Sequence, residues 1–168
     1  MSAGGQNHLR WPQVSPNADG VSNDFTSMES GSDAPKLLGF TGGMLATNSY
    51  VFRAADGWIA VDAPEGAAAW LESEGIEPRI LLLTHQHFDH VLGAAELVER
   101  FKCPVWAFSE FDTGLTLETF FSGFTGTSFE VVPFGIDRLL PETGPGESIE
   151  VAGTEMRVLH TPGHSPDS

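Results

Sequence analysis

The feature that most constrains this chain is a continuous apolar run followed directly by a cluster of metal-ligating residue types. Residues 80–83 read Ile-Leu-Leu-Leu, a pattern typical of a β-strand buried on both faces of a sheet. Residues 84–90 then read Thr-His-Gln-His-Phe-Asp-His. Residues 91–101 carry apolar side chains at helical spacing. This order predicts a strand-to-helix loop at the carboxyl end of a buried strand, where functional groups are commonly placed.

The residue types in this loop indicate metal binding. An extended chain points His85 and His87 the same way, because side chains alternate with a period of two. Asp89 and His90 add a carboxylate and a third imidazole, which completes a ligand set that zinc and similar metals prefer. The alternative is a solvated polar loop. A chance match to this pattern has a frequency of roughly four in ten thousand, and four titratable groups beside a buried strand need a partner.

A second histidine-bearing turn follows a strand-like segment later in the chain. Residues 157–164 read Arg-Val-Leu-His-Thr-Pro-Gly-His. A tight turn after a strand can present His164 toward a neighbouring loop, as a third ligand would require. His160 lies on the strand itself, and we expect it to be packed or to orient a ligand.

The remaining pattern alternates strands and helices and predicts the α/β (α+β) class. Tight turns join the first strands, with Asp56-Gly57 as a strong hairpin signal, so we expect a mixed sheet. Strands are expected at 37–40, 48–54, 58–61, 80–83, 105–108, 129–133, 148–151 and 155–159, and helices at 65–74, 91–101 and 109–121, with a loop at 122–128. Residues 1–34 are polar and predict a flexible tail, which leaves one domain over 35–168.

Charge and cysteine content narrow the function classes. The chain has 23 acidic and 8 basic residues and a net charge of -15, which disfavours nucleic-acid substrates and anionic lipid surfaces. Cys103 is the one cysteine, and we expect a buried structural thiol. No apolar stretch approaches the roughly 20 residues of a membrane span, and no secretory signal is visible. We therefore expect a cytoplasmic protein without a membrane partner.

The two histidine stretches, 84–90 and 161–165, resemble the signatures of the metallo-β-lactamase superfamily, above all its glyoxalase II (hydroxyacylglutathione hydrolase) branch. Residues 48–51 and 61–62 are similar to the family's early strands. The resemblance implies an αββα sandwich, of which this chain holds the N-terminal half and the start of the second. It also implies a bridging carboxylate and another histidine further on. Because the chain ends at Ser168, we expect it to be C-terminally incomplete, as a fragment or the product of a truncated gene.

Residue by residue, the resemblance implies two metal sites. The first would be held by His85, His87 and His164, and the second would begin with Asp89 and His90.

The same resemblance implies separate roles for two carboxylates. Asp89 would also orient the attacking water. Asp62 would orient a ligand imidazole, the alternative being a plain turn residue at a strand end.

The activity that follows is metal-dependent hydrolysis of a small-molecule ester or thioester, with one or two zinc ions, or iron or manganese. No Gly-x-Ser-x-Gly elbow is present, so activated water would be the nucleophile. The alternatives are an inactive metal-binding fragment, or another activity of the family, such as a lactonase or a sulfur dioxygenase. The net charge argues against the family's ribonucleases.

Overall fold

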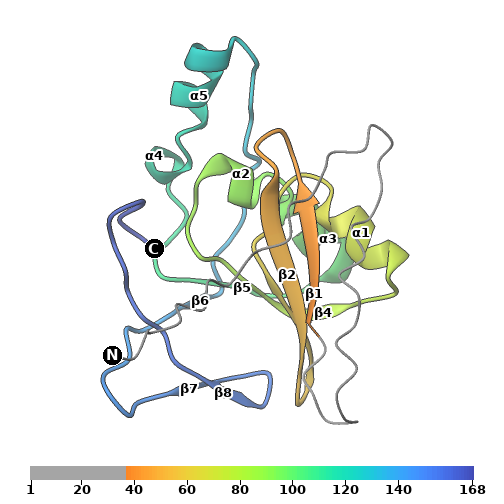
Figure 1. Ribbon diagram of the computed structural model, residues 1–168, viewed down its shortest axis with the longest axis vertical. Coiled ribbons are helices and arrows are strands. Elements are labelled where there is room, and N and C mark those ends of the chain that lie inside the picture. The colour runs from red at the N-terminus through yellow and green to blue at the C-terminus, as the bar shows by residue number, and fades with distance from the viewer. Residues whose placement is uncertain (1–36) are drawn as a thin grey trace, which may run out of the picture.

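A computed structural model describes residues 37–168 (Figure 1). The expected polar tail, residues 1–34, lies outside the described residues. The strands are β1 Leu37–Gly42, β2 Thr47–Ala54, β3 Gly57–Val61, β4 Pro78–Leu82, β5 Val105–Ala107, β6 Arg138–Leu139, β7 Ile149–Val151 and β8 Thr154–Met156. The helices are α1 Ala67–Ser73, α2 Phe88–Val91, α3 Ala94–Phe101, α4 Thr113–Thr116 and α5 Glu118–Thr125. None of the helices within 37–168 has the length and apolar character needed to cross a membrane.

The sheet is mixed, as the sequence predicts. Its strand order is β1-β2-β3-β4-β5-β6, and β7 and β8 form a separate antiparallel hairpin. The strands β1, β2 and β3 are antiparallel, whereas β3 to β6 run parallel to their neighbours. Ala54 pairs with Gly57 across the predicted hairpin turn. The α+β class is therefore confirmed.

Alternating side chains of the central strands are buried on both faces of the sheet. Ala60 and Leu81 belong to the larger core cluster, which includes residues of α1 and α3. Ile59 and Ile80, their neighbours in sequence, pack with Val151 of the β7–β8 hairpin. The period of two in a strand produces this division. The expectation that the apolar run at 80–83 is covered on both sides is confirmed.

Several elements differ from the expected pattern. The helix expected at 109–121 is two short helices, α4 and α5, and the strand expected at 155–159 ends at Met156. The helix expected at 91–101 begins at Ala94, as α3. A short helix, α2, precedes it and starts at Phe88, inside the expected loop at 84–90, and Leu92 and Gly93 separate the two. The backbone N–H of Gly93 donates to the carbonyl of Ala63 at 2.8 Å, and a Cβ on Gly93 would lie 2.6 Å from the carbonyl oxygen of Pro64. The chain can turn closely against the loop after β3 because this residue has no side chain.

The prediction of a strand at 129–133 is wrong, because these residues form no strand. Helix α5 extends to Thr125, into the region 122–128 that is expected to be a loop. Phe129 and Val131 do alternate toward the core, which explains the strand-like pattern. The backbone N–H of Val131, however, donates to the Glu118 carboxylate at 2.6 Å instead of to a neighbouring strand. Two residues of β6 take the sheet edge beside β5.

The topology brings two polar segments together at the carboxyl ends of β3 and β4. These parallel neighbours end side by side, and the backbone N–H of Asp62 donates to the Leu82 carbonyl at 2.9 Å. The N–H of Ala63 donates to the carbonyl of His90 at 2.8 Å. The residues after β3 are thereby fixed against the histidine loop after β4.

Candidate metal centre

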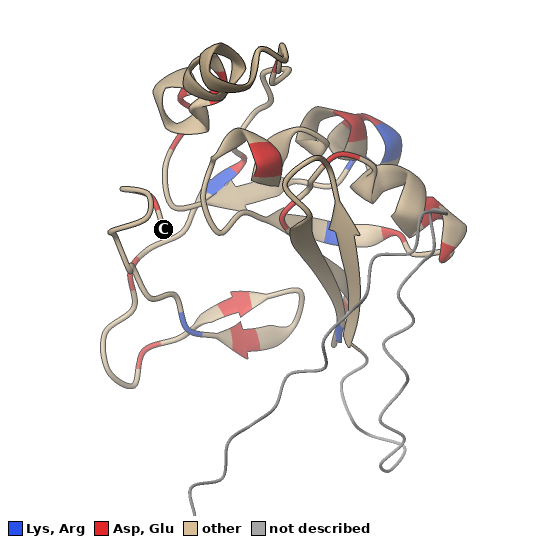
Figure 2. Ribbon diagram, turned by 45° about the horizontal axis from the view of Figure 1, so that its top comes forward, with Lys and Arg blue, Asp and Glu red and all other residues tan. Residues whose placement is uncertain are grey.

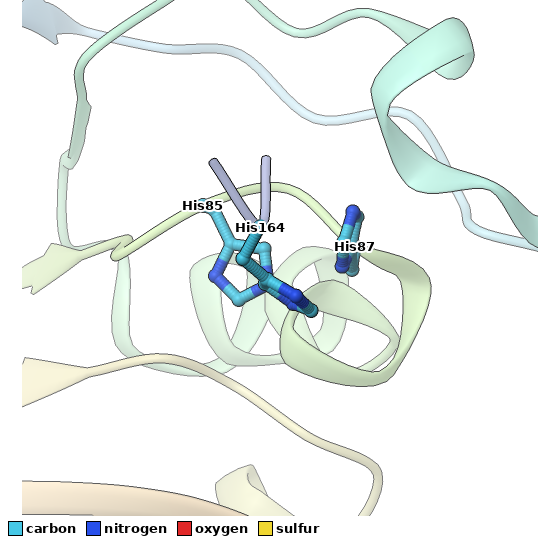
Figure 3. A group of neighbouring side chains, drawn as sticks. All are labelled: His85, His87 and His164. Atoms are coloured by element: carbon cyan, nitrogen blue, oxygen red, sulfur yellow. The ribbon is translucent and has the colours of Figure 1, made fainter. Parts of the chain in front are cut away.

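Three imidazoles converge beside α2. His85 and His87 lie in the loop between β4 and α2, and His164 reaches them from the turn that follows β8 (Figure 3). One ring nitrogen of each lies within 4.8 Å of those of the other two. The ring centroids are 4.5 Å apart for His85–His87 and His87–His164, and 4.9 Å apart for His85–His164. The structure thus brings together the three residues expected to hold the first metal.

His85 offers a direct test of whether this cluster suits a cation. Its Nδ1 lies 3.0 Å from Oγ1 of Thr84. Its Nε2 is buried and has no hydrogen-bond partner. A buried polar atom without a partner costs free energy, and a neutral imidazole nitrogen with a free lone pair is a good ligand for zinc and iron. The residues present therefore fit a metal ion.

Asp62 organises the hydrogen bonds behind this cluster. It is 4% exposed and follows β3 with a φ of 59°, a left-handed conformation that aspartate tolerates better than most residues. Its Oδ1 accepts from the backbone N–H of Thr84 at 2.8 Å, and its Oδ2 accepts from Oγ1 of Thr84 at 2.8 Å. Oδ2 also lies 2.9 Å from Nδ1 of His90, and Ser49 donates to the Asp62 carbonyl at 2.8 Å.

These contacts fix which nitrogen carries the proton in two neutral rings. A carboxylate only accepts hydrogen bonds, so Nδ1 of His90 must be the donor to Asp62. The hydroxyl hydrogen of Thr84 also points to Asp62, so Nδ1 of His85 must donate to the hydroxyl oxygen of Thr84. In its neutral form, each ring then leaves Nε2 unprotonated. Asp62 thus contacts the imidazole of His90 directly and that of His85 through Thr84.

Asp89 and His90 lie beside the three-histidine cluster. The His90 ring centroid is 4.1 Å from that of His85, and its Nε2 is 3.6 Å from Oδ2 of Asp89. The same oxygen accepts a 2.6 Å hydrogen bond from Thr47, a buried residue at the start of β2. Sequence reasoning did not identify Thr47, because nothing in the local sequence connects it with a loop so far along the chain.

The surroundings keep two of the rings neutral at neutral pH. Burial, followed by the neighbouring His90 and His87, lowers the pKa of His85 to about 4. Burial and the adjacent His164 lower the pKa of His87. Burial also acts to lower the pKa of His90, but the hydrogen bond and charge of Asp62, with Asp89, outweigh it and raise that pKa. Neutral His85 and His87 have lone pairs available for a cation.

Two other residues singled out in the sequence lie outside the cluster. His160 stacks on Phe108 with centroids 4.1 Å apart, and its Nε2 lies 2.8 Å from the carbonyl oxygen of Pro166. The expectation that it is packed is confirmed, but His160 does not lie on a strand, because β8 ends at Met156. Cys103 is buried, and burial raises the pKa of its thiol to about 11. This thiol is a structural residue and a poor nucleophile at neutral pH.

Residues 37–168 therefore form an α+β domain with a candidate multi-histidine metal centre at the carboxyl ends of β3 and β4. The sequence profile of the metallo-beta-lactamase superfamily matches residues 42–168. The chain belongs to this superfamily, which confirms the resemblance of the two histidine stretches.

Individual relatives agree with this assignment. The chain is 32% identical over 123 residues to a hydroxyacylglutathione hydrolase from Xylella fastidiosa, an alignment that covers 70% of this chain and 39% of the relative. The solved structure of TTHA1623 in a di-iron-bound form is 32% identical, with a TM-score of 0.61 over 77% of this chain and 63% of the other. The BLEG-1 B3 metallo-beta-lactamase is 27% identical, with a TM-score of 0.62 over 79% and 65%. The chain spans less than two thirds of the length of the first curated relatives it matches.

Proposed function

We propose that the protein is a metal-dependent hydrolase of small-molecule esters or thioesters, similar in activity to hydroxyacylglutathione hydrolases. One observation carries the proposal: three imidazoles converge on one small volume, and the buried Nε2 of His85 has no other partner there. The 32% identity to a hydroxyacylglutathione hydrolase supports a thioester as the substrate.

The centre suits hydrolysis by activated water. A cation held by His85, His87 and His164 supplies two things when bound, a lower pKa for water and polarisation of an acyl carbonyl. His90 and Asp89 lie at the edge of the same cluster and would hold a second cation. Zinc matches this donor set, and the di-iron form of TTHA1623 supports iron as the other principal candidate.

The protein's own residues would align the water and take up its proton. Asp89 is the carboxylate beside the cluster, and the hydrogen bond from Thr47 fixes the direction of its side chain. Its remaining acceptor capacity can orient a water molecule and accept a proton from it. Asp62 and Thr84 hold the imidazoles with Nε2 free. No protein nucleophile is needed, in agreement with the raised pKa of the buried Cys103 thiol.

The charge of the chain supports a small-molecule substrate over a nucleic acid. Acidic residues are spread over the helices, the turns and the β7–β8 hairpin, and basic residues are scattered among them (Figure 2). A net charge of -15 repels a phosphate backbone.

The test is an assay of the protein translated from the full reading frame that encodes this chain. The metal-free protein would be loaded separately with zinc, iron and manganese and offered a hydroxyacylglutathione thioester, a lactone and a phosphodiester. We expect turnover of the thioester that chelation and His87→Ala both abolish. Asp56→Asn, in the exposed β2–β3 turn, is the matched control and should retain it. Metal binding without turnover of any substrate would support an inactive metal-binding protein instead, and preferred turnover of the lactone would favour a lactonase.

A further inference from the structure

Gln86 has the least exposed polar side chain of the histidine loop, although it stands between two histidines of the candidate centre. It is 0% exposed. Because side chains alternate along an extended chain, Gln86 points away from the face that His85 and His87 share. Burying an amide is costly unless each of its polar atoms has a partner, so the partners of Gln86 indicate why a glutamine stands here.

Four hydrogen bonds join the Gln86 amide to the segment 109–112. Its Nε2 donates to the carbonyl of Ser109 at 3.3 Å, to Oγ of Ser109 at 2.9 Å and to the carbonyl of Glu110 at 3.0 Å. Its Oε1 accepts from the backbone N–H of Asp112 at 3.1 Å. The amide has only one orientation that fits, because a flipped group would set its oxygen against two carbonyl oxygens.

The segment that Gln86 contacts leads directly into α4 and α5. Asp112 is the N-cap of α4, and its side chain accepts from the backbone N–H of Gly114 at 2.7 Å. A second contact joins the same two regions: the ring of Phe88, the residue after His87, lies 5.0 Å from that of Phe121 in α5. Figure 1 shows α4 and α5 beside α2 at one end of the molecule. The histidine loop and this helical segment are thus tied together by a polar and an apolar contact.

We infer that Gln86 is a positioning residue of the metal centre. Its amide holds the backbone between His85 and His87 against residues 109–112. The geometry of the histidine pair and the conformational stability of α4 therefore depend on each other. The inference rests on the proposed metal site. It requires the amide itself, because an apolar side chain of the same size fills the space without holding either segment.

The test uses cobalt(II) binding to the metal-free full chain, followed by the visible absorption of the ion, which reports ligand geometry. Gln86→Met keeps the size of the side chain and loses the amide. Gln86→Glu keeps the shape but turns an acceptor toward two carbonyl oxygens. We expect both variants to bind cobalt at least about 10-fold more weakly, the range found for residues that orient metal ligands, with altered band intensities.

Leu71→Ala is the control for general destabilisation, because Leu71 is a buried core residue of α1 outside the centre. It should lower Tm and leave the cobalt spectrum unchanged. Equal cobalt affinity and spectra in wild type and both Gln86 variants would overturn the inference, and so would a spectrum altered as much by Leu71→Ala. A wild-type chain that binds no cobalt would overturn the proposed metal site, and the inference with it.

A measurement on the wild type alone keeps the inference testable if a variant does not fold. Cobalt binding should slow amide hydrogen exchange in peptides covering 109–116, because ordering the histidine loop also orders its partners. Unchanged exchange there, with cobalt bound, would show that the two segments are not coupled.

Discussion

Replacing Asp62 by asparagine should reverse the protonation pattern of the candidate centre while leaving the fold intact. The Asp62 oxygen that accepts from the backbone N–H of Thr84 must remain an acceptor. The new NH2 group therefore takes the place of Oδ2, facing Oγ1 of Thr84 and Nδ1 of His90. His90 then has to accept at Nδ1 and carry its proton on Nε2. The Thr84 hydroxyl becomes free to donate to His85, which moves that ring's proton to Nε2 as well.

The magnitude follows from these contacts. Charge-assisted hydrogen bonds contribute about 1.5–3 kcal/mol and neutral ones about 0.5–1.5 kcal/mol, so Asp62→Asn should lower the free energy of unfolding by about 1–2 kcal/mol. Asp62→Ala leaves three donors without their acceptor and should cost about 3–5 kcal/mol. Metal affinity should respond differently, because a protonated Nε2 cannot ligate. We expect Asp62→Asn to weaken metal binding by about 100-fold, at the upper end for residues that orient ligands.

The assay combines three measurements on wild type, Asp62→Asn and the surface control Asp56→Asn. Long-range proton–nitrogen NMR correlations above pH 8 report which ring nitrogen of His85 and His90 is protonated. Denaturant unfolding of the metal-free proteins gives the stability change, and elemental analysis after dialysis gives the metal content. Rings protonated on Nδ1 in Asp62→Asn, together with wild-type metal content, would refute the argument that Asp62 sets the tautomers.

Three further predictions concern the metal ligands, the hydrogen bond that orients Asp89, and the dependence of stability on pH. His87→Ala should lose the first metal on dialysis, whereas Asp89→Ala should retain it and lose hydrolysis; equal metal loss in both would contradict two sites. Thr47→Val removes the 2.6 Å hydrogen bond to Asp89 and should lower turnover about 10-fold, with rescue by Thr47→Ser; no difference between the two variants would show that the hydroxyl is dispensable. The metal-free protein should lose stability as pH falls from 6.5 to about 4, because the unfolded chain binds a proton at His85 whose pKa the fold lowers. Urea midpoints at pH 7 and 4.5 measure this, and His85→Gln should show a smaller decrease.

The fold class could be predicted because its main signals are local. The apolar run at 80–83, the Asp56-Gly57 turn and the alternation along β2 each determine an element from neighbouring residues. The segment 129–133 was misleading for a physical reason: its apolar residues alternate because they cover the core, while its backbone bonds to a side chain.

The residues of the candidate site also fall into those that the sequence could indicate and those that it could not. Residues 84–90 carry three histidines and Asp89 within one short segment, the loop after β4 and the first residues of α2, so their proximity follows from chain connectivity. His164 could be suggested only through its turn, because its approach to His85 depends on how β7 and β8 return to the sheet. Thr47 and Gln86 gain their roles from long-range hydrogen bonds. A buried glutamine between two histidines is nevertheless a signal that sequence reasoning could have used.

The left-handed backbone at Asp62 also bears on how this centre could be transplanted or could diverge. Asp62 has a φ of 59°, which glycine, asparagine and aspartate adopt at lower cost than most other residues. Of these three, only aspartate supplies two acceptor oxygens to Thr84 and His90. The backbone conformation and the hydrogen bonds at this position therefore both favour aspartate. A designer who grafted the histidines onto another sheet would need to copy this bend in the backbone along with the side chains.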